Sequence, residues 1–168
     1  AVGRYRKREP EGCADTLVAV SNLAQVLLLR GKLAEAEPLM REDLKLSRRM
    51  HGVSHPDSLV ALGNLAQLLA ERGQGREAER MLREQLAGYR GALGNSHPHT
   101  LTSLSNLAFL LHSTGNHEQA EPLLREEVAA STVALGPRHP ETRAALRRLA
   151  VGLEKLGRAD EARPLRRA

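Results

Sequence analysis

The sequence predicts an all-α fold in which antiparallel helical hairpins stack into a superhelix. Two observations carry this prediction. Four short markers recur every 42 residues in one frame, and no stretch has the alternation or the β-branched enrichment of a strand. In the second repeat the markers begin at His55 (His-Pro), Asn64 (Asn-Leu-Ala), Gly73 and Ala78 (Ala-Glu). The frame divides the chain into repeats at 13–54, 55–96, 97–138 and a partial repeat at 139–168.

The first residues fit the same frame. Residues 1–8 align with the back half of a second helix, with Val2 at the place of Leu86 and Tyr5 at the place of Tyr89. We therefore expect residues 1–12 to be the end of a preceding repeat helix. The chain has no starting Met and no secretory pattern, so we expect it to be part of a longer chain or a larger complex.

The first helix of each repeat is predicted from apolar spacing and from its ends. In the second repeat, Leu59, Leu62 and Leu65 follow one another at helical three-residue steps. Pro56 suits the first helical position, where a missing N–H costs nothing, and Gly73 suits a left-handed stop. These signals place a helix between Pro56 and Gly73.

A second helix is predicted from about residue 75 to residue 92. Met81, Leu82 and Leu86 would form its inner side, and Gly94 would end it before the next His-Pro. One small residue recurs on each helix of the pair, where it would let the two helices approach closely. These residues are Ala24, Ala66, Ala108 and Ala150 on the first helices and Ala36, Ala78, Ala120 and Ala162 on the second. A hairpin of this size cannot bury its apolar face alone, so neighbouring hairpins must form one core.

Composition excludes several classes of protein. The 168 residues are 41% hydrophobic and 27% charged, as in an ordinary folded domain. Aromatic residues make up 2%, too few for a base-stacking platform, and the single Cys13 excludes an internal disulfide or a cysteine-built zinc site. No apolar run is long enough to span a bilayer, so no membrane insertion is expected.

The net charge of +5 does not indicate nucleic-acid binding. The excess lies at the two ends, with four basic and two acidic residues in 1–12 and eight basic and four acidic residues in 139–168. A protein that follows a phosphate backbone would instead carry a continuous basic stripe.

The repeated residues resemble the tetratricopeptide repeat, in the 42-residue form of kinesin light chains. The pattern is carried by Leu93-Gly94-Asn95-Ser96-His97-Pro98, Ser105-Asn106-Leu107-Ala108, Gly115 and Glu118-Gln119-Ala120-Glu121-Pro122-Leu123-Leu124. It extends over almost the whole chain, from Asp15 to Leu165. The resemblance implies a tetratricopeptide-repeat superhelix whose concave surface, lined by the first helices, binds peptides or partner helices. It implies neither catalysis nor a cofactor.

One position departs from that resemblance. The family commonly has a small residue late in the second helix, whereas this chain has Asp43, Gln85 and Glu127 there. Two interpretations are open: a polar surface that meets a partner, or a loosened contact.

Neither a metal site nor an active site is predicted. His55, His97 and His139 lie one repeat apart and form a row, which favours a capping or packing role at the turns. His51 lies near His55 in sequence, but no acidic residue adds a clear third ligand. No serine has a recurrent triad partner, and no glycine-rich phosphate loop occurs, so we expect no enzyme and no cofactor.

The residues most suggestive of binding are polar and lie in the middle of the first helices. Asparagine is a mediocre helix former, so its recurrence at Asn22, Asn64 and Asn106 requires a reason. Its amide can both donate to and accept from an extended peptide backbone. The alternative is that these amides tether the neighbouring hairpin. The candidate peptide-groove residues are Asn22, Gln25, Asn64, Gln67, Asn106, Phe109, His112 and Arg148.

We therefore predict a non-catalytic protein–protein interaction scaffold that binds a peptide or a partner helix in a concave groove. A fixed structural subunit of a large complex is the alternative, and a helical-repeat RNA binder is a third class. The expected compartment is the cytoplasm; the alternative is an organelle, with the targeting segment absent from this chain.

Overall fold

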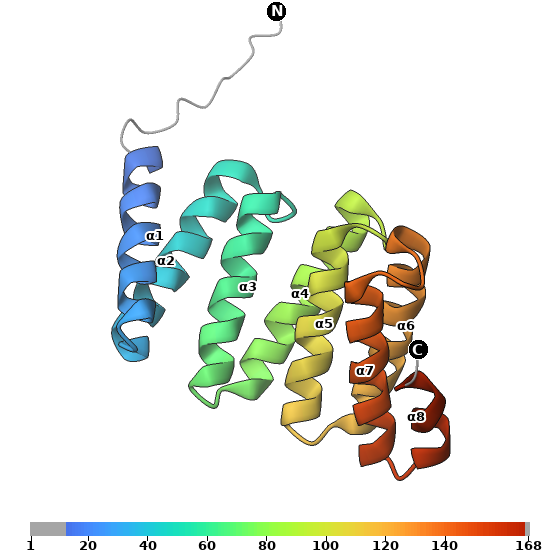
Figure 1. The fold of residues 1–168 in the computed structure, drawn as a ribbon. Helices are drawn as coiled ribbons and strands as arrows, with labels where there is room; N and C mark the ends of the chain where they lie inside the picture. Colours follow the sequence, from blue (N-terminus) through green and yellow to red (C-terminus); the bar gives the residue numbers. More distant parts are fainter. Residues whose placement is uncertain (1–12, 167–168) are drawn as a thin grey trace, which may run out of the picture.

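The computed structural model describes residues 13–166, and these residues form eight helices and no strand (Figure 1). The helices are α1 (Cys13–Leu29), α2 (Leu33–His51), α3 (Pro56–Glu71), α4 (Gly75–Leu93), α5 (Pro98–Ser113), α6 (His117–Leu135), α7 (Pro140–Lys155) and α8 (Ala159–Leu165). The all-α prediction is confirmed, and the limits of α3 and α4 agree with those expected from Pro56, Gly73 and Gly94. The helix end predicted at residues 1–12 lies outside the described residues.

The helices follow one another in a row, and each contacts the helix before it and the helix after it in the chain. In Figure 1 the first helices of the hairpins, α1, α3, α5 and α7, lie toward the viewer, and α2, α4 and α6 lie behind them. Each second helix therefore packs between two successive first helices. This order leaves the outer sides of the first helices on one common face.

Leucine and alanine form the core of the array. Leu62, Leu65 and Leu69 of α3 are almost completely buried, as the helical spacing predicts. The eight recurrent alanines are buried as well, which confirms that helices approach closely at these points. A larger side chain at any of these positions would force two helices apart.

The turns between hairpins are closed by the recurrent histidines. The Nδ1 atom of His55 accepts the backbone N–H of Asp57 at 3.3 Å, and His97 and His139 accept equivalent bonds at 3.2 Å. Each histidine thus caps the helix that begins at the following proline, so the predicted capping role is confirmed. Gly73 has a φ of +78°, a left-handed conformation that favours glycine at the helix end.

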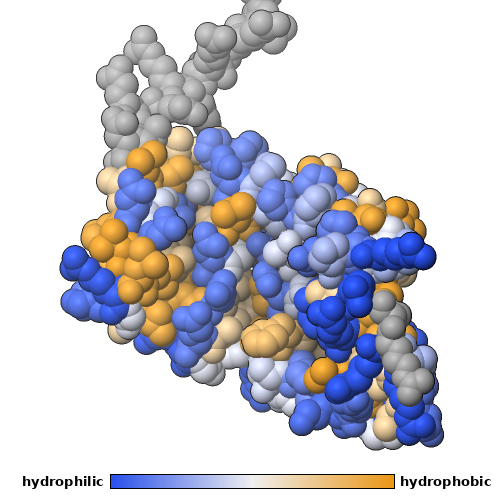
Figure 2. Space-filling model, in the orientation of Figure 1, coloured by the Kyte–Doolittle hydropathy of each residue, from blue (hydrophilic) through white to orange (hydrophobic). Residues whose placement is uncertain are grey.

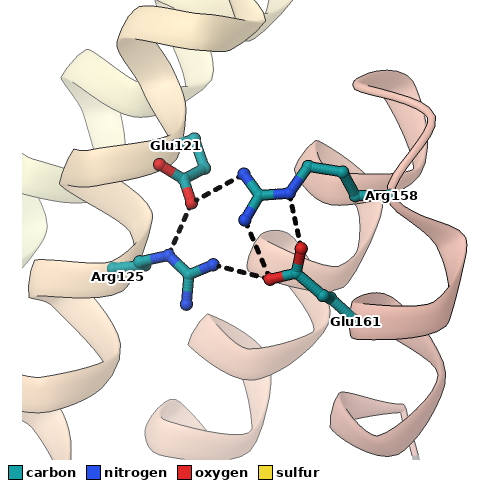
Figure 3. Close-up of polar contacts among 4 residues, drawn as sticks. All are labelled: Glu121, Arg125, Arg158 and Glu161. Atoms are coloured by element: carbon teal, nitrogen blue, oxygen red, sulfur yellow. Dashed lines mark hydrogen bonds and ion pairs between the residues drawn. The ribbon is translucent and has the colours of Figure 1, made fainter.

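Arginines connect successive second helices at the surface. Arg41 of α2 bonds to Glu77 of α4 at 2.9 Å, and the equivalent Arg125 of α6 bonds to Glu161 of α8 at 3.1 Å. At the second place the pair joins a cluster in which Arg158 bonds to both Glu121 and Glu161 (Figure 3). These exposed pairs hold the hairpins in register but contribute little individually.

The departure late in the second helices is a structural contact, which corrects the interpretation of a loosened contact. Gln85 is buried, where it donates to the Leu59 carbonyl at 2.9 Å and accepts from the Ser103 hydroxyl at 3.1 Å. Gly63 makes room for it, because a Cβ there would lie 2.0 Å from the Gln85 amide nitrogen. Gln85 therefore ties α4 to both α3 and α5.

The equivalent acidic residues are also bonded. Asp43 accepts from the Ser21 hydroxyl at 2.6 Å, and the buried Glu127 pairs with Arg148. A polar group is tolerated at this depth because each has a hydrogen-bond partner. The polar groups at this position are thus bonded within the array, which excludes a loosened contact.

Candidate functional site

Among three cavities between successive first helices, the largest lies between α3 and α5. Its volume is about 600 Å³, and Leu82 of α4 contributes to its floor. Gln67 lines one wall, and Asn106 and Phe109 line the other. Helix α4 packs against both α3 and α5 and closes the cavity from behind.

Similar cavities lie on either side of it. One of about 350 Å³ lies between α1 and α3, with Met40 and Asp43 of α2 in its lining. Another of about 520 Å³ lies between α5 and α7, with Glu127 and Ser131 of α6 in its lining. The spaces between successive first helices therefore form a row along the array.

A further cavity of about 360 Å³ between α1 and α3 is lined by Asn22, and the four cavities together are lined by seven of the eight candidate groove residues. These are Asn22, Gln25, Asn64, Gln67, Asn106, Phe109 and Arg148. The three asparagines and both glutamines are exposed, so their amides are accessible rather than enclosed between hairpins. The amides make no hydrogen bond to another residue of the described part of the chain.

Phe109 adds an exposed aromatic ring to this row of cavities. It is 71% exposed, although an aromatic ring of this kind is usually buried, and it lines the largest cavity beside Asn106. The equivalent positions in the two preceding first helices are Gln25 and Gln67. The equivalent residue in α7 is Val151, which is 39% exposed, so this position is apolar in α5 and α7 and polar in α1 and α3.

Arg148 differs from the asparagines that it replaces in the repeat. Its guanidinium bonds to the carboxylate of Glu127, which is 3% exposed, through Nη2, with Nε 3.4 Å from the second oxygen. A buried carboxylate requires such a partner. Arg148 is thus occupied by an internal ion pair, while its edge still lines the cavity between α5 and α7.

His112 does not line a cavity with Phe109. It is half-buried, and its Nδ1 lies 3.1 Å from the Nδ1 of His117 at the start of α6. Burial, followed by the nearby His117 and Lys155 charges, lowers the pKa of His112. The neutral ring is therefore favoured. His112 makes a contact between α5 and α6.

A second group of side chains was overlooked in the sequence. His51, His55 and Asp57 each offer a ligand atom, and these atoms lie within 4.8 Å of one another. The expectation that no acidic residue adds a third ligand is therefore wrong. The signal was visible as an aspartate two residues after the His of the capping pair.

Three comparisons with known proteins bear on these features. A family model described as tetratricopeptide repeat matches residues 15–91, 64–132 and 99–165. Kinesin light chain-like nearly identical TPR-like repeats from Podosopora anserina match at 27% identity and a TM-score of 0.80, over 94% of this chain and 74% of that one. No curated protein sequence matches the chain.

A more distant structure has the same fold. BtubC (BKLC) from P. vanneervenii matches at 16% identity with a TM-score of 0.82, over 96% of this chain and 64% of that chain. Within residues 13–166, no helix combines the length and apolarity needed to cross a membrane. Both similarities extend along almost the whole array.

Proposed function

The chain belongs to the tetratricopeptide repeat family, and from that premise we propose that it is a non-catalytic scaffold that binds an extended peptide or a partner helix. Members of this family are generally protein–protein interaction scaffolds rather than enzymes. The proposed binding surface is a concave groove formed by the row of cavities between α1, α3, α5 and α7. Phe109, Asn106 and Gln67 would be its centre.

The observation that carries the proposal is the set of exposed asparagine amides on the first helices. Asn22, Asn64 and Asn106 are exposed at one repeat position, and each lines a cavity. Hydrogen bonding explains why a mediocre helix former would stand there, because an amide offers donors and an acceptor to a peptide backbone. The stacking of the hairpins sets the distance from one asparagine to the next, so an extended ligand could contact more than one of them.

Phe109 would supply the apolar anchor of the interaction. Interfaces concentrate their energy in a few residues near the centre, and aromatic side chains are prominent among them. The largest cavity lies directly beside this ring, with Leu82 and Leu110 in its lining. We therefore expect an apolar side chain of the ligand to enter between α3 and α5.

The test is a displayed peptide library selected on the purified chain, followed by affinity measurements on variants. Replacing Asn64 and Asn106 by Ala should weaken a selected peptide by about 1 kcal/mol per lost hydrogen bond, or roughly fivefold each. The matched control replaces Arg49 and Arg80, which are exposed on the second helices, by Ala and should leave affinity unchanged. Unchanged affinity in the asparagine variant, with its helical content intact, would reject the groove.

The same measurements address the other two classes. A fixed subunit would purify with stoichiometric neighbours and yield no peptide that depends on the asparagines. An RNA-binding array would show affinity for RNA that falls steeply with added salt. Either result would reject the peptide-binding scaffold in favour of the corresponding class.

A further inference from the structure

We propose that the turn between α2 and α3 is a binding site for a divalent transition metal of the zinc class, with His51, His55 and Asp57 as its ligands. This proposal does not rest on the proposed groove function, although Asp57 also lines the cavity that contains Asn22 and Asn64. Imidazole and carboxylate are ligands that such ions prefer, and a site with three protein ligands leaves the fourth position to solvent.

The distances suit such an ion. Oδ2 of Asp57 lies 3.5 Å from Nδ1 of His55 and 3.9 Å from Nε2 of His51. Two zinc ligands at bond lengths of about 2.0–2.1 Å in tetrahedral geometry are roughly 3.3 Å apart. Small rotations of exposed side chains would therefore close the group around one ion.

The two rings are already placed side by side. The ring centroids of His51 and His55 are 4.7 Å apart, and their planes differ by 25°. His51 is the last residue of α2 and His55 caps α3, so both are positioned by helix ends rather than by a long loop. Little chain ordering would be needed when the ion binds.

Metal binding through Nδ1 of His55 must compete with the hydrogen bond that caps α3. Nδ1 of His55 has a single lone pair, which accepts the backbone N–H of Asp57. At 3.3 Å this bond is longer than the usual 2.7–3.2 Å, so it is a weak competitor. A metal bound through Nδ1 would replace the bond, and its coordination by the Asp57 carboxylate would still join His55 to the first turn of α3.

The repeat itself does not require this group. At the position of His51 the later repeats have Leu93 and Leu135, and at the position of Asp57 they have His99 and Glu141. Two histidines and a carboxylate therefore meet at one turn, whereas the capping histidine alone is common to all three. The other two turns serve as internal controls.

The test is calorimetric titration of the chain, without a polyhistidine tag, with zinc chloride. We expect one zinc per chain at this turn. His51→Leu, which introduces the residue of the other turns, and Asp57→Ala should each weaken it at least about tenfold, since even outer-shell partners of a metal contribute that much. His139→Asn, which changes the capping residue of a turn without the group, should leave the affinity unchanged.

Two further readouts separate the site from a general effect on folding. Cobalt(II) should give the absorption of a nitrogen- and oxygen-ligated ion, and His51→Leu should abolish it while helical content is retained. Zinc should raise the thermal midpoint of the unchanged chain by mass action but not that of the variant. No zinc binding, equal affinity in His51→Leu, or an equal loss in His139→Asn would overturn the proposal.

Discussion

Helices α1 and α3 have the same motif at the same repeat positions, but their apolar residues differ in burial. Leu23 of α1 is 51% exposed, whereas the equivalent Leu65 of α3 is 1% exposed. Val26 and Leu68 differ in the same way. Helix α3 packs extensively against both α2 and α4, while α1 packs extensively against α2 alone among the described helices.

The difference shows that burial in this array depends on neighbouring hairpins more than on the residue itself. In a stacked solenoid each unit contacts only the adjacent units, and within residues 13–166 α1 has a neighbouring hairpin on one side only. Apolar side chains accordingly gather over α1 on the left of the face shown in Figure 2. The second hairpin should therefore be the more stable of the two.

The largest expected effect comes from truncating the buried leucine. Leu65→Ala should lower the free energy of unfolding by about 2–5 kcal/mol, because it leaves a cavity between helices. Leu23→Ala, the same change in α1, should cost less than about 1 kcal/mol. Urea denaturation of both variants measures this difference, and equal losses would contradict the role of neighbours.

The next effect concerns a position at which α1 and α3 differ in sequence. Gly63 leaves room for Gln85, whereas Ser21 stands at the equivalent place beside the shorter Asp43. Gly63→Ala should lower the free energy of unfolding by about 1–3 kcal/mol, because the methyl group displaces the amide from its bonds.

A second helical glycine provides the matched control. A Cβ at Gly91 would meet no atom within 4 Å. Gly91→Ala should therefore raise stability by up to about 1 kcal/mol, through the better helix propensity of alanine. Thermal unfolding of the two variants would sharpen the comparison, and two changes of the same sign would refute it.

The smallest effect is expected at the surface pair between α2 and α4. The hydrogen bond from Arg41, more than its charge, holds the pKa of Glu77 below its ordinary value of 4.5, while partial desolvation acts in the opposite direction. A lowered carboxylate pKa contributes stability above the unfolded value, and this contribution is lost as the pH falls through the folded value.

Arg41→Gln should therefore reduce stability at pH 7 by less than about 1 kcal/mol, since both groups are partly exposed. The reduction should shrink in high salt and as the pH falls through the lowered pKa of Glu77, where the carboxylate becomes protonated. Urea denaturation at pH 3 and pH 7 checks this. A reduction that is larger at pH 3 would show that the pair does not link the first two hairpins in this way.

Helix limits and caps could be predicted from the sequence because their causes are local. Pro56 favours a first helical position whatever surrounds it, and Gly73 favours a left-handed stop. The exposure of Leu23 could not be predicted in this way, since its motif is identical to that of the buried Leu65. Burial there depends on the neighbouring helix.

The candidate site was predictable in part for the same reason. Helical spacing placed Asn64 and Gln67 on one face of the first helix, but it could not show that Arg148 is held by Glu127. Nor could it show which groups the Gln85 amide bonds to, because its partners lie on two other helices. Gly63 was the available signal, since a glycine in mid-helix often marks a close approach.

The central claim is that a ligand lies between the first helices, and site-directed photo-cross-linking tests it most directly. A photoreactive side chain at position 67, which lines the cavities on both sides of α3, should become attached to a library-selected peptide. The same group in place of Arg80, whose side chain is 77% exposed on α4, should not. Attachment at position 80 and none at position 67 would contradict binding in the groove.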